Sequence, residues 1–342
     1  MSRRRFLSII IALVALAAWR PAPCPAQQAA ATDATDTPHR LAAYAHISVT
    51  LPRNASPVQE KFVTQTIDAA LPRDRFEDVT VGADESLAKA QAAAIEAHAD
   101  VFVHVKATVP KPMQFRQRFG QGRFSRSVAI HVLRTPLTLD LYVRNDQRWR
   151  KSQKIRLTSA DVPDAERDSF GSLEDDLYDH WGRALRALVP AACEQALLKH
   201  FLPNTTVKAV KVEGEAQPDE AQALAEGEFP EAPEDPPSQV QIELTNRSYS
   251  QVADATVTIE QYNKGRDRWE SMDRPRLAIF RRPDEAEQPP LVWKVIESVD
   301  PGRVVSTDSI TLSDRILRAV ERRQCRLVLH ATPVVTSLNP SR

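Results

Sequence analysis

The sequence predicts a two-domain α+β protein: an α/β domain with a mixed sheet covered by helices, followed by an all-β domain. Strand and helix patterns alternate over residues 41–212, whereas short strands separated by turn residues fill residues 239–336. Between them, residues 213–238 hold nine acidic residues, five prolines and no lysine or arginine. That composition is typical of an extended, self-repelling linker, so we place the domain boundary there.

In the first domain, each expected element has its own periodicity. Residues 44–51 alternate between apolar and polar side chains, which predicts a strand. Ser56, followed by Pro57 and Gln59, predicts a helix with a capping box. We expect Asp84 to cap a second helix and Pro190 to kink or divide a third, with the helices in one layer on the sheet. Further strands are expected at residues 78–81, 101–109, 128–133, 137–143, 149–158 and 207–212.

The second domain shows strands at short spacing. The turn signals that separate them include Asn246 to Ser248, Lys264-Gly265 and Pro301-Gly302. The expected strands are residues 240–244, 255–262, 276–280, 291–296, 304–312 and 326–331, with a short helix at residues 313–323 and a tail from residue 337. Six or seven strands in roughly a hundred residues resemble an immunoglobulin-like β-sandwich.

The first 26 residues are typical of an export signal. Arg3, Arg4 and Arg5 precede an apolar run, Phe6 to Ala18, that is short for a membrane span. Cleavage after Ala26 is expected, and a retained, uncleaved anchor is the alternative. The start of the segment resembles the twin-arginine pattern of bacteria, and an ordinary Sec signal is the alternative. Residues 27–40 are expected to be a disordered leader. We therefore expect an exported protein, periplasmic or extracellular, without a transmembrane helix after signal removal.

The composition and the absence of common motifs argue against several classes of function. The formal net charge is zero, so no overall field indicates a nucleic-acid partner. The sequence has twenty-five prolines and nine glycines, so we do not expect a glycine-rich phosphate-binding loop. No dinucleotide-binding or P-loop motif occurs. The sequence also lacks the common hydrolase, metalloprotease and thiol-redox motifs. We accordingly expect no cofactor and leave enzyme status open, with a non-catalytic role preferred.

The first domain resembles a known group of envelope domains. The stretches that carry the resemblance are Ala99 to Val103 and Leu139 to Asp146, followed by a closing helix. They resemble the TolB amino-terminal and curli-secretion-lipoprotein-like periplasmic α/β domains, over residues 41–212. The resemblance implies a non-enzymatic envelope module that docks on other proteins.

A basic, aromatic stretch without acidic residues is the first candidate site. It connects two predicted strands, and we expect it to form a loop. Arginines with interleaved aromatic rings can hold phosphate groups and stack on flat groups. Behind an export signal, the partner would be an envelope protein or an anionic polymer or lipid surface; the alternatives are a solvated loop or one paired with the acidic linker. The candidate residues are Lys111, Phe115, Arg116, Arg118, Phe119, Arg123, Phe124 and Arg126.

Three histidines are the second candidate site. Period-two counting directs His46, His104 and His131 away from the apolar faces of their strands. If these strands are neighbours, the rings converge near Asp140, and three histidines with one carboxylate form a competent zinc set. Ordinary, half-exposed strand histidines are the alternative. The predicted function is therefore envelope binding or scaffolding, and the runner-up is a hydrolase or metalloenzyme that uses this histidine face.

Overall fold

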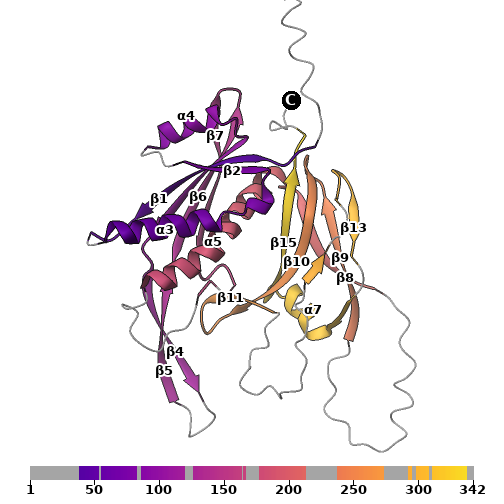
Figure 1. Cartoon of the computed structure of the whole chain (residues 1–342). Helices are drawn as coiled ribbons and strands as arrows, with labels where there is room; N and C mark the ends of the chain where they lie inside the picture. The colour runs from indigo at the N-terminus through magenta and orange to yellow at the C-terminus, as the bar shows by residue number, and fades with distance from the viewer. Residues whose placement is uncertain are drawn as a thin grey trace, which may run out of the picture. The chain divides into compact units, whose positions relative to one another are not determined.

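The computed structural model has a mixed α and β fold built on open sheets, which confirms the predicted fold class at that level (Figure 1). The predicted signal peptide, most of the leader and of the linker, the strand expected at residues 276–280 and the tail lie outside the described residues. Pro38–Arg342 forms one unit, and the description concerns that unit. The structure describes residues 38–53, 55–82, 86–119, 126–163, 165–166, 177–212, 237–272, 292–294, 298–307 and 310–336.

A five-stranded mixed sheet organises the first part of this unit. Its order is β2-β1-β3-β6-β7. β1 is parallel to both β2 and β3, whereas β3–β6 and β6–β7 are antiparallel pairs. The parallel pairs need crossover connections, which α3 and α4 supply. The strands are β1 (Ala42–Thr50), β2 (Asp78–Gly82), β3 (Val101–Thr108), β6 (Pro136–Asn145) and β7 (Arg148–Thr158), with helices α3 (Pro57–Ala70), α4 (Leu87–Glu96) and α5 (Leu177–Phe201).

Helices lie on both faces of this sheet, not in the single layer that the sequence predicts. Val63 of α3 and Leu185 of α5 join Val103 in one core cluster. Ala90 of α4 packs with Phe102, whose strand position directs it to the opposite face. The difference arises because Tyr44 of β1 and Phe102 of β3 lie on this second face. The small side chains Ala90 and Ala94 of α4 cover them.

The helix ends are largely as expected. The Ser56 capping box is present: the Ser56 hydroxyl accepts from the Gln59 amide, and the Gln59 side chain accepts from the Ser56 amide. The second helix begins later than predicted, because Ser86 and not Asp84 is its N-cap. α5 runs through Pro190 as one helix. In the described part of the chain, no helix combines the length and apolar character needed to cross a membrane.

The stretch predicted as a basic loop is mostly a β-hairpin. β4 (Lys111–Phe119) pairs with β5 (Arg126–Arg134) to form a separate two-stranded sheet. Because β4 follows β3 and β5 precedes β6, the hairpin continues the β3–β6 pair beyond the mixed sheet (Figure 1). The alternation of Met113 and Phe115 with polar residues was the signal for a strand, and the pairing with β5 supplies its hydrogen bonds.

Two further open sheets make up the second part. In one, β9 is central and pairs with β8, β13 and β14; in the other, β10 is central and pairs with β11, β12 and β15. Val240 and Ile242 of β9 pack with Val257 and Ile259 of β10, so the two sheets share a core. The elements are β8 (Thr205–Lys211), β9 (Pro237–Asn246), β10 (Gln251–Asn263), β11 (Arg268–Ser271), β12 (Val292–Lys294), β13 (Val304–Ser306), β14 (Ile310–Ser313), α7 (Asp314–Glu321) and β15 (Cys325–Val334).

The position of β8 differs from the sequence-based division. The sequence predicts this strand at the end of the first domain, before the linker. In the structure, β8 pairs antiparallel with β9 along its whole length, from Thr205–Asn246 to Lys211–Val240. Residues 213–236 therefore connect two paired strands of one sheet.

One apolar cluster joins the two parts. α5 packs on β6 and β7 of the mixed sheet and also on β15. Leu188 of α5 belongs to the same buried cluster as Leu141 of β6, Ala255 of β10 and Ala331 of β15. The long helix is thus covered from both sides, and its burial holds the mixed sheet and the β10–β15 sheet together.

Substitution of Trp181 tests how much the burial of α5 contributes to stability, because this side chain is completely buried in the cluster. We expect Trp181→Ala to lower the free energy of unfolding by about 3–5 kcal/mol, measured by urea denaturation. Trp181→Phe retains most of the volume and removes an indole N–H that has no hydrogen-bond partner among the described residues. Its cost should stay below about 1.5 kcal/mol. Equal losses for the two variants would contradict this assignment.

Candidate functional site

The structure places the predicted basic site on the β4–β5 hairpin. Lys111, Arg116 and Arg126 lie on its two strands and are exposed, and Phe115 is half-buried. Arg118 and Phe119 belong to the end of β4, where the structure describes only the backbone. The last two candidates lie in residues 120–125, outside the described residues: Arg123 and Phe124.

The hairpin has two unlike faces. Directly opposed residues of an antiparallel pair lie on the same face. Phe115 pairs with Ile130 and Met113 with Val132, which makes an apolar face with Ile130 and Val132 buried. Arg116 pairs with Ala129 on the other face and is exposed. The hairpin therefore has one face with an apolar centre, with Lys111 and Arg126 towards its two ends, and a second face that carries Arg116; these three basic residues are exposed.

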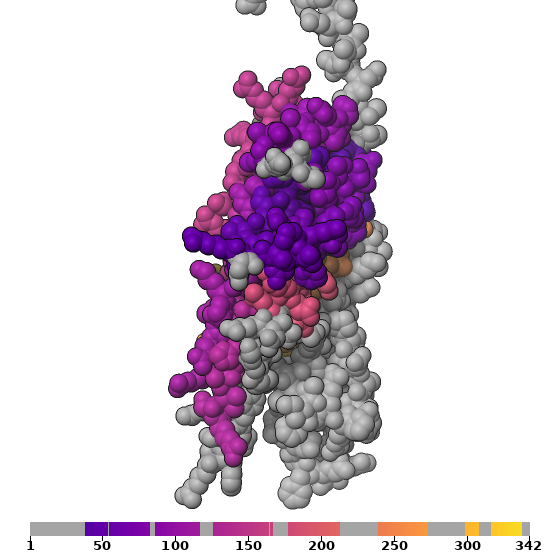
Figure 2. Space-filling model, turned by 60° about the vertical axis from the view of Figure 1, so that its left-hand side comes forward, coloured from indigo at the N-terminus to yellow at the C-terminus, as the bar shows by residue number. Residues whose placement is uncertain are grey.

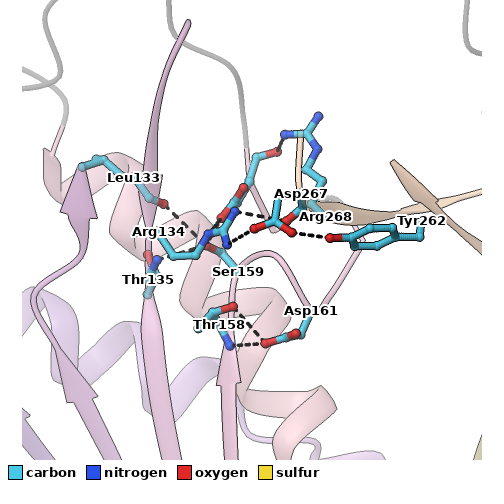
Figure 3. A network of polar contacts seen from close by, with 10 residues as sticks. Leu133, Arg134, Thr135, Thr158, Ser159, Asp161, Tyr262, Asp267 and Arg268 are labelled. Carbon is cyan, nitrogen blue, oxygen red and sulfur yellow. Dashed lines mark hydrogen bonds and ion pairs between the residues drawn. The ribbon is translucent and has the colours of Figure 1, made fainter. Parts of the chain in front are cut away.

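A polar network fixes the base of this hairpin (Figure 3). Arg134, the last residue of β5, donates through Nε to Glu166 Oε1 at 2.9 Å, and the Ser159 hydroxyl donates to the same oxygen at 2.7 Å. The Glu166 side chain is only 1% exposed. Burial raises the pKa of Glu166, although Ser159, Arg134 and Arg268 act in the opposite direction. Ser159 and Arg134 therefore offset part of the effect of burial, which disfavours the charged form of Glu166.

The same arginine reaches the turn between β10 and β11. Its guanidinium lies 3.4 Å from Asp267 Oδ2 and donates to the Asp267 carbonyl oxygen at 3.2 Å. The Tyr262 hydroxyl donates to Asp267 from the other side (Figure 3). The Trp269 amide also donates to the Ala160 carbonyl at 2.9 Å. The hairpin base, the end of β7 and the β10–β11 turn are thus held as one assembly.

We expect Arg134→Gln to destabilise the fold by about 3–5 kcal/mol at neutral pH, because it leaves Glu166 buried without its ionic partner. The deficit should shrink as the pH falls and Glu166 takes up a proton. Chemical denaturation across this pH range measures both effects.

Two further variants sharpen this test. Adding Glu166→Gln to Arg134→Gln should restore more than half of the lost stability, since no buried charge remains. Arg126→Gln, at the exposed opposite end of β5, should cost less than about 0.5 kcal/mol. A double variant as unstable as Arg134→Gln would contradict the role given to the ion pair.

The predicted histidine set is divided between two sheets. His46 of β1 and His104 of β3 are register partners with ring centroids 4.9 Å apart, and Asp140 of β6 is opposite His104. His131 lies on β5 of the hairpin, opposite Gln114. Within the described ranges, no group of three or more histidine, cysteine, aspartate or glutamate side chains is arranged to hold a metal ion.

Around Asp140 the sheet carries an ionic cluster that is not among the sites predicted from the sequence. The Asp140 side chain is 1% exposed, with Lys106 Nζ at 2.7 Å and Lys151 Nζ at 2.6 Å. Burial opposes ionisation of Asp140, but the hydrogen bonds and charges of these two lysines outweigh it and lower the pKa of the carboxyl. Residues 101–158 contain thirteen lysines and arginines and two acidic residues. That local excess was the available signal.

The same environment weakens His104 as a base. Burial, followed by the charges of Lys106 and His46, lowers the pKa of His104 to about 4. Its Nε2 lies 2.8 Å from the Ser48 hydroxyl. At neutral pH this imidazole is uncharged and accepts a proton poorly, so the Ser48–His104 contact is a weak arrangement for activating a nucleophile.

A second ionic cluster joins α5 to the β10–β15 sheet. Glu194 of α5 accepts at 2.7 Å from His330 Nδ1 and at 3.0 Å from the Ala331 amide, both on β15. His330 Nε2 lies 3.1 Å from the Thr258 hydroxyl, and Arg75, in a short 3-10 helix (Arg73–Arg75), is 3.6 Å from Glu194. The sequence could not reveal this pairing, because 136 residues separate Glu194 from His330.

His330 gives the stability of the fold a defined pH dependence. Burial lowers the pKa of His330, but the hydrogen bond and charge of Glu194, with the charge of Glu260, raise it above 6.5 overall; Arg75 opposes them weakly. A raised pKa stabilises the fold below about pH 6.5, and this contribution is lost as the pH rises through the folded-state pKa.

We therefore expect the stability difference between the native chain and His330→Gln to be largest below about pH 6.5 and to decline at alkaline pH. Thermal unfolding of both proteins over this range measures the difference. His98→Gln, a change of an exposed histidine, is the control and should leave the profile unchanged. A difference that grows with pH would contradict the assignment.

Comparisons with known proteins give little further guidance. No protein-family model matches the sequence, and no curated protein matches it. Among solved structures, a protein described as a homologue of a neuraminyllactose-binding hemagglutinin from Helicobacter pylori has a TM-score of 0.30 and 9% identity, covering 45% of this chain and 81% of that chain. The PelC dodecamer from Paraburkholderia phytofirmans has a TM-score of 0.23 and 15% identity, covering 44% and 91%. The hypothetical protein CT253 from Chlamydia trachomatis has a TM-score of 0.23 and 10% identity, covering 34% and 69%. At these scores the similarities carry no argument about function.

Proposed function

We propose that the chain is an exported, non-catalytic protein of the bacterial cell envelope that binds an anionic surface through the β4–β5 hairpin. The observation that carries this proposal is the charge of the hairpin. Residues 111–134 contain six lysines and arginines and no acidic residue. Arg134 is engaged by the acidic pair Glu166 and Asp267, whereas Lys111, Arg116 and Arg126 are exposed.

The placement of the hairpin supports this role. It extends beyond the mixed sheet in both views (Figures 1 and 2). A two-stranded ribbon on its own is marginally stable in water, so a fixed base matters for presenting its exposed basic residues. The Arg134 network provides that base, and the half-buried Phe115 packs its ring 5.9 Å from the Arg134 guanidinium carbon.

The export signal, the resemblance to periplasmic domains and the immunoglobulin-like arrangement remain parts of the proposal. The arginines and apolar run at residues 3–18 favour export. Two open sheets that share an apolar core support a sandwich in the second part. We assign this sandwich a scaffolding role, with an envelope protein as its partner.

The proposal is tested by vesicle sedimentation. The full chain should bind phosphatidylcholine vesicles that contain phosphatidylglycerol, and should not bind phosphatidylcholine alone. Each basic residue near an anionic surface contributes about 1 kcal/mol, so Lys111→Gln, Arg116→Gln and Arg126→Gln together should weaken binding about 100-fold. Raised salt should weaken binding of the native chain in the same direction.

The matched control removes three exposed lysines elsewhere: Lys61→Gln, Lys89→Gln and Lys199→Gln. It changes the net charge equally and should bind as the native chain does. A lipopolysaccharide or teichoic-acid preparation forms a second arm, in which the same variant ranking would also support hairpin binding to an anionic surface. Equal binding by the hairpin variant and the native chain in both arms would refute the proposal.

A further inference from the structure

The face of the mixed sheet on which α4 packs carries two rows of polar side chains across four adjacent strands. One row is His46, His104, Asp140 and Lys154; the next is Ser48, Lys106, Thr138 and Arg156. Lys151 lies on the same face, with its Nζ 5.9 Å from the centre of the Tyr142 ring. Four basic side chains therefore surround one carboxylate on this face.

The basic groups have unused hydrogen-bonding capacity. Asp140 engages one lysine with each oxygen, Lys106 through Oδ2 and Lys151 through Oδ1. An ammonium group has three N–H donors, so each lysine retains two. The side chains of Lys154 and Arg156 are exposed and have no ion pair or hydrogen bond with any residue that the structure describes.

Acidic side chains are absent from these strands apart from Asp140. β1, β3, β6 and β7 together hold seven lysines and arginines and one aspartate. Pairing with Asp140 offsets one positive charge of the four on this face. In addition, His104 is 6% exposed, and its Nδ1 has no hydrogen-bond partner among the described residues. The face combines surplus positive charge with a buried polar atom that lacks a partner.

We propose that this face binds a small, soluble ligand that carries a phosphate group, with its oxygens held by Lys106, Lys151, Lys154 and Arg156. Lysine ammonium groups and an arginine fork are established phosphate-binding groups, and a phosphate has several oxygens to accept their N–H donors. The site lies on β3 and β7 and does not depend on the proposed role of the β4–β5 hairpin.

The position of α4 favours a small ligand over a membrane. α4 packs on the same face, where Ala90 and Ala94 lie against Tyr44 and Phe102. Tyr44 and Phe102 are each two residues before His46 and His104 on their strands. A helix is about 10 Å thick and stands above the sheet beside the basic rows, so a flat bilayer cannot reach them. A phosphate ester has no such restriction.

Titration calorimetry of the full chain with inorganic pyrophosphate tests the site. Hydrogen bonds to charged groups contribute strongly to binding. The double variant with Lys154→Gln and Arg156→Gln should therefore bind pyrophosphate at least about tenfold more weakly. These side chains are exposed and have no partner among the described residues, so the variant should fold normally. Asp140→Asn should tighten binding, because it removes the negative charge beside the ligand. Raised salt should weaken binding.

The matched control is Arg148→Gln with Arg150→Gln. Both arginines are exposed and lie on β7, and Arg150 is opposite Val143, which belongs to the core on the other face. This control and the Lys111, Arg116 and Arg126 hairpin variant should bind pyrophosphate as the native chain does. The proposal is overturned by an absence of pyrophosphate binding, by equal weakening in the two β7 variants, or by loss of binding in the hairpin variant.

Discussion

Burial of α5 is the constraint on which the rest of the structure depends. One side of the helix covers the mixed sheet, and Glu194 on it reaches β15 of the second part. Buried apolar side chains of this helix, such as Trp181, Leu185 and Leu188, lie in one cluster with residues of the mixed sheet, β10 and β15. The stability of both parts is therefore linked, and neither sheet retains its full core if α5 is displaced.

Charge is segregated on this framework. The chain is neutral overall, yet residues 101–158 carry an excess of eleven positive charges, from thirteen basic and two acidic residues. Like charges at this density repel unless the fold separates them. β7 directs Arg150 and Lys154 to opposite faces, and the hairpin carries another group of basic residues beyond the sheet. The fold distributes one basic stretch over three surfaces.

Local features were predictable from the sequence, and long-range pairings were not. The Ser56 capping box and the alternation of β1 depend on neighbouring residues, so the sequence identified both. The closeness of His46 and His104 followed from period two once β1 and β3 were neighbours. His131 could not be placed, because β5 pairs outside the mixed sheet. The Asp140 cluster required the register of three strands, which no single segment encodes.

The pairing of β8 with β9 has a consequence for how this chain tolerates changes in length. Residues 213–236 close a loop between strands that are already hydrogen-bonded along their length. Loop-closure entropy rises only with the logarithm of loop length, so doubling or halving this segment changes stability by about 0.6 kcal/mol. Insertions and deletions there are consequently nearly neutral for folding. Variation in the length and acidic charge of this segment is therefore free to serve demands other than folding.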